Sequence, residues 1–180
     1  MTLRERFASA MTLREFVEQA DANKDLWVAA SRRAEAPSAL VQRLQALAAP
    51  RYLLALAEDW CGDALGTLAP LASLVDQVPQ LELKILARDE NLDIMDAHLT
   101  RGARAIPVVI VLDEQFAELG WWGSRPAPLQ RWVSSPEAKA LSKEERYREI
   151  RRWYASDRGH TALGEITDLL EAGAQIKDVA

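Results

Sequence analysis

The chain of 180 residues contains a single cysteine, Cys61, within the stretch EDWCGDALGTLAP at residues 58–70. A short apolar run precedes this stretch and a helical pattern follows it, so we expect Cys61 where a strand meets a helix. Unpaired backbone N–H groups at a helix start favour an anion, and therefore the thiolate form of Cys61. The carboxylate of Asp63 acts in the opposite direction. These residues predict a reactive thiol and leave its net pKa shift open. The alternative is a buried free thiol that acts only as a small hydrophobic side chain.

Four apolar or β-rich runs predict the strands that position this thiol. A helical stretch at 64–78 separates the first two runs, which should therefore be parallel. Only residues around 113–115 separate the last two, which should form an antiparallel hairpin. A short helix is expected at 91–99. The predicted strands are residues 51–57, 81–87, 106–112 and 115–122. The pattern predicts an α/β fold with a mixed central sheet.

Helical patterns precede the predicted sheet. Thr2 with Glu5, and Thr12 with Glu15, have the spacing of capping boxes. The sequence MTLRE occurs at residue 1 and again at residue 11, either by chance or because Met11 is the true start. In both cases we expect the first ten residues to be dispensable.

Further helices complete the chain. Ser38 is placed to cap a helix that stops at Pro50. After the sheet, helices are predicted at 127–133, 142–156 and 161–173, the last ending with Gly173 as its C-cap. We therefore divide the chain into an N-terminal helical extension (1–39), a core (40–135) and a C-terminal helical extension (136–180).

The composition narrows the function classes. A hydrophobic content of 49% supplies a sizeable core. The 22 basic and 27 acidic residues are mixed along the chain and give a net charge of −5, so nucleic acid is not an expected partner. The sequence shows no secretory signal pattern and no membrane-spanning run. One cysteine cannot form an internal disulfide, which fits a reducing compartment, and we expect a cytoplasmic protein.

Three motifs in order resemble a known family. They are WCGDA at 60–64, ARDENLDIMDAHLTRGARAIPVVIVLD at 87–113 and GWWGSRP at 120–126. Together they resemble bacterial thioredoxin-like proteins that carry WCGD followed by Cys or Ala, over roughly residues 40–135. The resemblance implies an α/β thioredoxin-like fold, with a mixed central sheet, helices on both faces, and extra helices at both ends.

The resemblance places the substrate beside the thiol. Trp60, Gly62, Asp63 and Ala64 flank Cys61 and are implied to contact the substrate. Trp60 would shield one side of the sulfur and offer an apolar surface, although a buried tryptophan could equally belong to the core.

A second implied segment faces Cys61. Pro107 is implied to be a cis proline, and the backbone of Ile106 to pair with an extended substrate. The alternative is that Pro107 merely starts an edge strand. Gly123 is implied to border the same groove. Trp121 and Trp122 alternate faces, so one should pack in the core and the other line the groove; Trp122 is our candidate.

Two departures from thioredoxins restrict the chemistry. Ala64 stands where the resolving thiol would be, and Ala55 replaces the buried acid that assists that thiol. A dithiol cycle within the chain is therefore excluded. Arg125 and Pro126 are interpreted as fixing the entry into the next helix. His98 and His160 are interpreted as surface residues, and no metal site or bound cofactor is expected.

We predict a monothiol oxidoreductase or isomerase that uses Cys61 on a protein or small-molecule disulfide. An external thiol, such as glutathione as a co-substrate, would resolve the mixed disulfide. The alternative is a redox-inactive module that binds a polypeptide in the same groove. A peroxide-sensing thiol that stops at sulfenic acid is a third hypothesis. The oligomeric state stays open.

Overall fold

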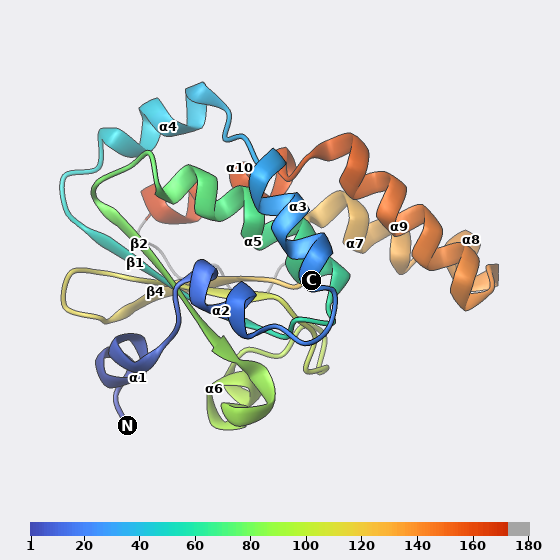
Figure 1. The fold of residues 1–180 in the computed structure, drawn as a ribbon, viewed down its shortest axis with the longest axis horizontal. Helices are drawn as coiled ribbons and strands as arrows, with labels where there is room; N and C mark the ends of the chain where they lie inside the picture. Colours follow the sequence, from blue (N-terminus) through green and yellow to red (C-terminus); the bar gives the residue numbers. More distant parts are fainter. Residues whose placement is uncertain (173–180) are drawn as a thin grey trace.

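A computed structural model describes residues 1–172 of the chain, so Gly173, the predicted C-cap, lies outside the described residues. Its centre is a four-stranded sheet in the order β2-β1-β3-β4 (Figure 1). β1 is parallel to β2 and antiparallel to β3, and β3 is antiparallel to β4. The strands are β1 (Arg51–Ala57), β2 (Leu81–Ala87), β3 (Val108–Leu112) and β4 (Glu118–Gly123). The predicted mixed sheet is confirmed.

The two central strands explain the apolar runs in the sequence. Every residue of β3 is buried, and so are the last five residues of β1. A strand covered on both faces needs apolar side chains at consecutive positions, whereas β2 and β4, at the edges, also carry polar or partly exposed residues. The buried leucine and valine side chains thus hold β1, the strand that precedes Cys61, at the centre of the sheet.

Helices cover both faces of this sheet. α5 (Gly62–Val75) connects β1 to β2 and lies on one face with α10 (His160–Ala172), while α6 (Leu92–Ala97) lies on the opposite face (Figure 1). α6 follows a short 3-10 helix, η1 (Arg88–Glu90). α10 contacts α4 (Ser38–Gln45), α5 and β4 and contributes Leu163, Ile166 and Leu170 to the core. The predicted boundary at residue 135 therefore divides elements that share one core.

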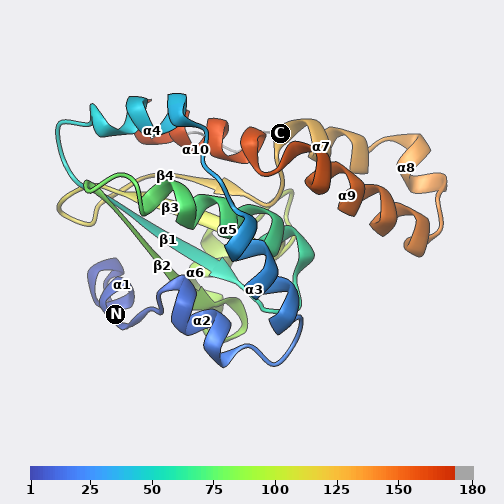
Figure 2. The ribbon, with the colours of Figure 1, turned by 45° about the horizontal axis from the view of Figure 1, so that its top comes forward.

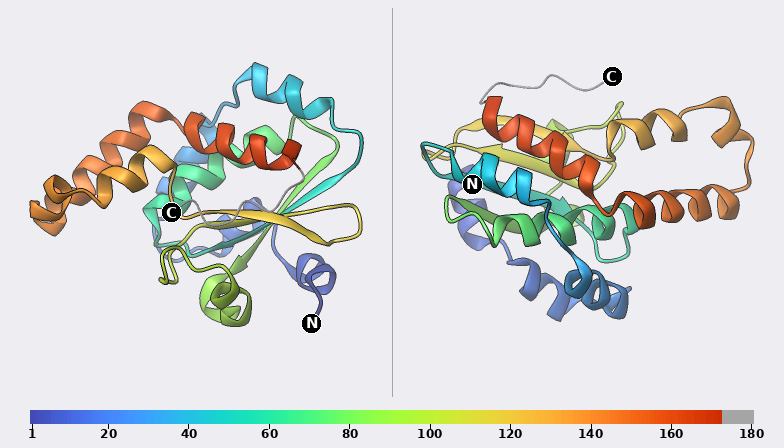
Figure 3. Two further views of the ribbon diagram at one scale, coloured as in Figure 1. Left: turned by 180° about the vertical axis from the view of Figure 1, so that it is seen from behind. Right: turned by 90° about the horizontal axis from the view of Figure 1, so that it is seen from above.

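The remaining C-terminal helices form an arm. α7 (Ala127–Val133), α8 (Pro136–Ala140) and α9 (Lys143–Asp157) project beyond the sheet, as Figure 2 and the right-hand view of Figure 3 show. The chain turns from α9 into α10 at Gly159, which has a φ of 83°. A Cβ at this position would lie 2.6 Å from Pro70 Cγ, so only glycine permits both the turn and the close approach to α5.

The N-terminal helices pack against the core. α1 (Leu3–Ser9) and α2 (Leu13–Gln19) begin with the two predicted capping boxes, and α3 (Lys24–Arg33) follows them. Phe7 of α1 is buried, with its ring centroid 5.2 Å from that of Tyr52 and 5.4 Å from that of Phe116. The first ten residues therefore contribute a side chain to the core, and the expectation that they are dispensable is wrong in this respect.

Between these helices the chain touches the edge of the sheet. The Met11 N–H donates to the Ile85 carbonyl at 2.9 Å, and the Ile85 N–H donates back at 2.7 Å. This single antiparallel bridge lies on the side of β2 away from β1.

Local details differ from the predictions. Ser38 is the first residue of α4 and caps nothing, because Pro37 is the N-cap, and the helix ends at Gln45, before Pro50. α5 begins at Gly62, two residues earlier than predicted, and ends at Val75.

His98 is not a surface residue. Its side chain is buried, with Nδ1 2.7 Å from the Ile94 carbonyl and Nε2 3.2 Å from the Glu118 carboxylate. Burial lowers the pKa of His98, but the hydrogen bonds to Glu118 and Ile94 outweigh it and leave the pKa raised.

No helix within residues 1–172 combines the length and apolar character needed to cross a bilayer.

Replacing Phe7 with alanine should lower the free energy of unfolding by about 3 kcal/mol, because it removes a buried ring from its contacts with Tyr52 and Phe116. Urea denaturation followed by circular dichroism measures this difference. Leu26→Ala is the control, since the Leu26 side chain is 59% exposed. Equal stability of Phe7→Ala and the unmodified protein would contradict the packing role of α1.

Candidate functional site

The sulfur of Cys61 lies at the start of α5. β1 ends at Ala57, and three loop residues lead to Cys61, which is the N-cap of the helix. Its Sγ accepts a hydrogen bond from the Ala64 N–H at 3.4 Å. Cys61 is 7% exposed. The thiol thus occupies the predicted strand-to-helix junction but is largely covered.

The Ile106–Pro107 segment faces this sulfur. The Cys61 thiol donates to the Ile106 carbonyl oxygen at 3.5 Å, and the peptide bond between Ile106 and Pro107 is cis. Behind it, Gly123 at the end of β4 approaches so closely that a Cβ would lie 2.8 Å from the Pro107 carbonyl oxygen. The fold therefore brings together residues from three distant parts of the sequence.

A buried ion pair lies beside the thiol. Arg125 Nη2 is 2.6 Å from Asp63 Oδ2, and the Asp63 side chain is buried. Burial lowers the pKa of Arg125, but the Asp63 carboxylate outweighs this and leaves it raised. Arg125 thus joins the segment after β4 to the first turn of α5. The sequence interpretation, in which Arg125 fixes the entry into the next helix, did not identify this partner, which is 62 residues away in sequence.

Tyr154 of α9 packs against the same turn of α5. A Cβ on Gly66 would lie 2.5 Å from Tyr154 Cδ1, so the ring lies directly on the glycine backbone. Burial raises the pKa of the Tyr154 hydroxyl far above its ordinary value, and the Asp63 carboxylate adds to the increase. Tyr154 is therefore a neutral wall of the site at any physiological pH.

The environment of Cys61 favours the thiol. Burial raises the pKa of Cys61, and the Asp63 carboxylate raises it further. The Ala64 N–H and the Arg125 guanidinium lower the pKa without compensating for burial, so the net shift is upward. The sequence left the direction of the net pKa shift open, and burial, the largest effect, decides it in favour of the thiol.

The thiol opens into a groove of about 1190 Å³ between α3, α5 and α9. Of the predicted substrate-contacting residues, Trp60, Cys61, Gly62, Asp63 and Ile106 line it. Trp60 is 52% exposed and lies against Arg88, whose guanidinium carbon is 5.2 Å from the ring centroid. Trp60 therefore offers the apolar surface that was predicted and is not part of the core.

The other four predicted contact residues do not line the groove. Ala64 and Pro107 are buried beneath it, and Gly123 supports Pro107 from behind. Trp122 is a core residue whose Nε1–H donates to Glu165 Oε2 of α10 at 2.6 Å. The prediction that Trp122 lines the groove is corrected, because α10 packs against β4 and covers the face of the sheet on which Trp122 lies.

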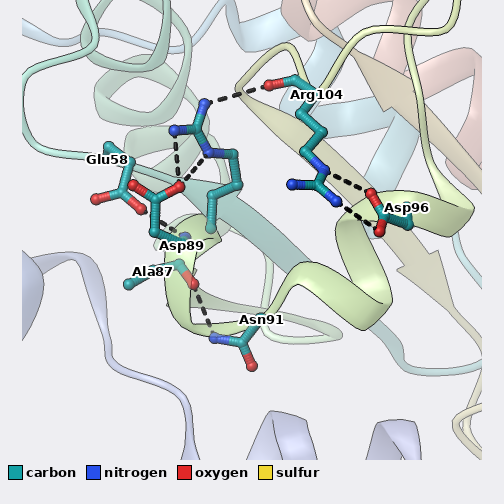
Figure 4. Close-up of polar contacts among 7 residues, drawn as sticks. Glu58, Ala87, Asp89, Asn91, Asp96 and Arg104 are labelled. Atoms are coloured by element: carbon teal, nitrogen blue, oxygen red, sulfur yellow. Dashed lines mark hydrogen bonds and ion pairs between the residues drawn. The ribbon is translucent and has the colours of Figure 1, made fainter.

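Ion pairs and hydrogen bonds hold the neighbouring loops in place (Figure 4). The Arg104 guanidinium forms two hydrogen bonds with the Asp96 carboxylate, at 2.6 and 2.8 Å. The Asp89 N–H donates to Glu58 Oε1 at 2.9 Å. These contacts connect the segment before Pro107 to α6, and η1 to the loop before Cys61.

The sequence interpretation missed the walls formed by α3 and α9. The groove-facing residues of α9 include Lys143, Tyr147, Arg151 and Tyr154, which recur every three or four residues along the helix. This spacing was visible in the sequence. It indicated that these side chains share one face of a helix, but it did not indicate what that face contacts.

The chemistry available at the site is that of a thiol. Within residues 1–172, no group of three histidine, cysteine or carboxylate side chains is arranged to hold a metal ion. The hydrogen-bond partners of Sγ are two backbone groups, the Ala64 N–H and the Ile106 carbonyl.

A protein-family model described as thioredoxin matches residues 10–149. Among solved structures, a protein of unknown function from Pseudomonas aeruginosa is similar to this chain, with 27% sequence identity and a TM-score of 0.78 over 97% of this chain and 99% of the other. An HIV epitope-scaffold has 25% identity and a TM-score of 0.75 over 96% and 99% of the two chains. The comparison with curated proteins gave no match.

The raised pKa of Cys61 predicts slow alkylation at neutral pH. Because a raised pKa leaves less thiolate at pH 7, the iodoacetamide rate should rise through the alkaline range, with a midpoint above that of the same cysteine in the urea-unfolded chain. Cys61→Ser provides the blank. A rate that already reaches its plateau at neutral pH would contradict the upward shift.

Gly123→Ala should lower the free energy of unfolding by about 2 kcal/mol, because the added Cβ would contact the Pro107 carbonyl oxygen. Gly164→Ala in α10 is the matched control: its Cβ would meet no atom within 4 Å, so this variant should be at least as stable as the unmodified protein. Thermal unfolding of both variants measures the contrast, and equal melting temperatures would contradict the close approach.

Proposed function

The chain belongs to the thioredoxin family, and on this basis we propose that it exchanges thiols and disulfides through the single sulfur of Cys61. One observation carries the proposal. The Cys61 sulfur lines the groove at the N-terminus of α5 and lies 3.5 Å from the Ile106 carbonyl, next to the cis peptide bond of Pro107. A disulfide in the groove could therefore reach the sulfur and the Ile106 backbone together.

The exchange needs one sulfur in the protein. Cys61 loses its proton to solvent, and its thiolate attacks one sulfur of the substrate disulfide. The substrate S–S bond breaks, a Cys61–substrate disulfide forms, and the second substrate sulfur leaves as a thiolate that takes up a proton. An external thiolate then attacks the bound substrate sulfur, forms a new disulfide with it and releases the Cys61 thiolate. No electrons are gained or lost overall.

The resolving thiol has to come from outside the chain. Ala64 is buried at the position three residues after Cys61, and Cys61 is the only cysteine in the sequence. A low-molecular-weight thiol such as glutathione is our proposed co-substrate. Isomerisation of a disulfide in a protein substrate also requires only this one sulfur.

The backbone of Ile106 is suited to orient the substrate. Its carbonyl oxygen accepts one hydrogen bond from the Cys61 thiol, and a carbonyl oxygen has a second lone pair that an extended substrate can use. When Cys61 ionises, the S–H donor is lost, and this carbonyl becomes free to accept from the substrate backbone.

A second function is favoured by a different observation. Cys61 is only 7% exposed, and burial raises its pKa, so most of the molecules carry a thiol at neutral pH. These properties are typical of a cysteine that reacts slowly. They favour the alternative proposal of a module that binds a polypeptide in the groove without forming a disulfide.

Mixed-disulfide formation separates these two functions. Incubation with glutathione disulfide should add one glutathione to the folded protein, and reduced glutathione should remove it, as measured by intact-protein mass. Cys61→Ser should show no adduct. If the folded protein stays unmodified under conditions in which the urea-unfolded chain reacts, the exchange function is rejected and the binding module is favoured.

Ala64→Cys extends this test. Its added thiol, three residues after Cys61, should release the bound glutathione without any external thiol and leave an internal disulfide. An adduct that persists in this variant would show that the new sulfur cannot reach Cys61 Sγ.

A further inference from the structure

The groove beside Cys61 is positively charged, although the protein is not. Its lining includes seven arginine or lysine side chains and two carboxylates, Glu35 and Asp63. The whole chain has a net charge of −5. Positive charge is therefore concentrated on this surface although the net charge of the protein is negative. Such a surface raises the local concentration of anionic ligands.

Three of these seven cations are neutralised by partners within the protein. Each lies within 2.8 Å of a carboxylate oxygen, and the pairs are Arg88 with Asp89, Arg104 with Asp96, and Arg125 with Asp63. These arginines mainly hold the loops around the thiol in place.

The other four cations have no carboxylate partner within residues 1–172. They are Arg33, at the end of α3, and Lys143, Arg151 and Arg158, on one side of α9 and its C-cap. Lys143 and Arg158 are fifteen residues apart, which corresponds to about 22 Å along a helix. The three unpaired charges of α9 and its C-cap therefore form a row, and Arg33 of α3 lines the same groove. Among the described lining residues, the only carboxylate besides Asp63, which pairs with Arg125, is Glu35.

Large apolar side chains are exposed in the same groove. Leu26, Trp60 and Tyr147 are 59%, 52% and 45% exposed, and all three belong to its lining. Together with Met1, they are the exposed large hydrophobic residues of the described chain. Lys143 Nζ lies 6.0 Å above the Tyr147 ring, so charge and apolar surface alternate along α9. Such a combination marks a binding surface.

Two helices place these side chains around the thiol. α3 and α9 both contact α5, the helix that begins directly after Cys61. At about 1190 Å³, the groove exceeds the range of ordinary small-molecule pockets, about 300–1000 Å³. A row of about 22 Å matches six or seven residues of extended polypeptide.

We propose that this groove binds an acidic polypeptide segment that also carries apolar side chains. Its carboxylates contact the row formed by Lys143, Arg151 and Arg158 together with Arg33 of α3, and its apolar side chains contact Leu26, Trp60 and Tyr147. The choice of a polypeptide over another polyanion rests on the proposed function, because Cys61 lines the groove, and a polypeptide that carries a disulfide supplies the sulfur that the Cys61 thiolate would attack.

Fluorescence anisotropy tests the proposal with a labelled peptide of about eight residues, rich in glutamate and containing leucine. The intact protein should bind it, with an affinity that falls as ionic strength rises. The same peptide with glutamine in place of glutamate should bind about tenfold more weakly. No binding of the acidic peptide, or equal binding of both peptides, overturns the proposal.

Matched variants locate the binding. Lys143→Gln with Arg151→Gln should weaken the acidic peptide about tenfold. Lys139→Gln with Arg148→Gln removes the same charge from exposed positions outside the groove and should change the affinity less than twofold. Circular dichroism checks that both variants fold. Equal losses in the two double variants would mean that only net charge matters, and would overturn the proposal.

Further measurements distinguish failure of the groove proposal from failure of the proposed exchange function. An oligothymidylate of the same charge that binds as tightly as the acidic peptide would overturn the choice of polypeptide in favour of nucleic acid. Cys61→Ser should bind the acidic peptide like the intact protein. Charge-dependent peptide binding without any glutathione adduct on Cys61 would reject the exchange function alone, whereas an adduct without charge-dependent peptide binding would reject the groove proposal alone.

Discussion

The buried pair of Asp63 and Arg125 is the interaction on which the site depends. It joins the first turn of α5 to the segment after β4, two parts of the chain that the sheet alone does not connect. Breaking such a pair by removing one partner typically costs about 3–5 kcal/mol, because the remaining charge stays buried. The two members also act on Cys61 in opposite directions, since Asp63 raises and Arg125 lowers the pKa of the thiol. Because these two effects oppose each other, burial remains the largest influence on the pKa of Cys61.

Sequence patterns were sufficient where neighbouring residues decide the structure. The apolar runs at 51–57 and 81–87 became strands with those bounds, and Cys61 became the N-cap of the helix that follows. Burial in a sheet centre and the start of a helix are encoded locally, so periodicity and residue type were enough to place the thiol.

The same reasoning failed where the partner is distant. Trp122 was assigned to the groove because nothing near it reveals Glu165, and His98 was assigned to the surface because nothing near it reveals Glu118. The role of Arg125 depends on Asp63, and the protonation preference of Cys61 depends on burial in the packed fold, where the Ile106 segment lies against the sulfur. Pair contacts of this kind arise only when the elements pack.

The bridge between Met11 and Ile85 also affects how the protein behaves toward other molecules. A sheet edge exposes unpaired N–H and carbonyl groups that can pair with a strand of another chain. At Ile85, in the middle part of β2, both groups are already paired with Met11. A foreign strand would have to displace the link between α1 and α2 before it could add to this edge. The N-terminal segment therefore also protects the sheet against association through β2.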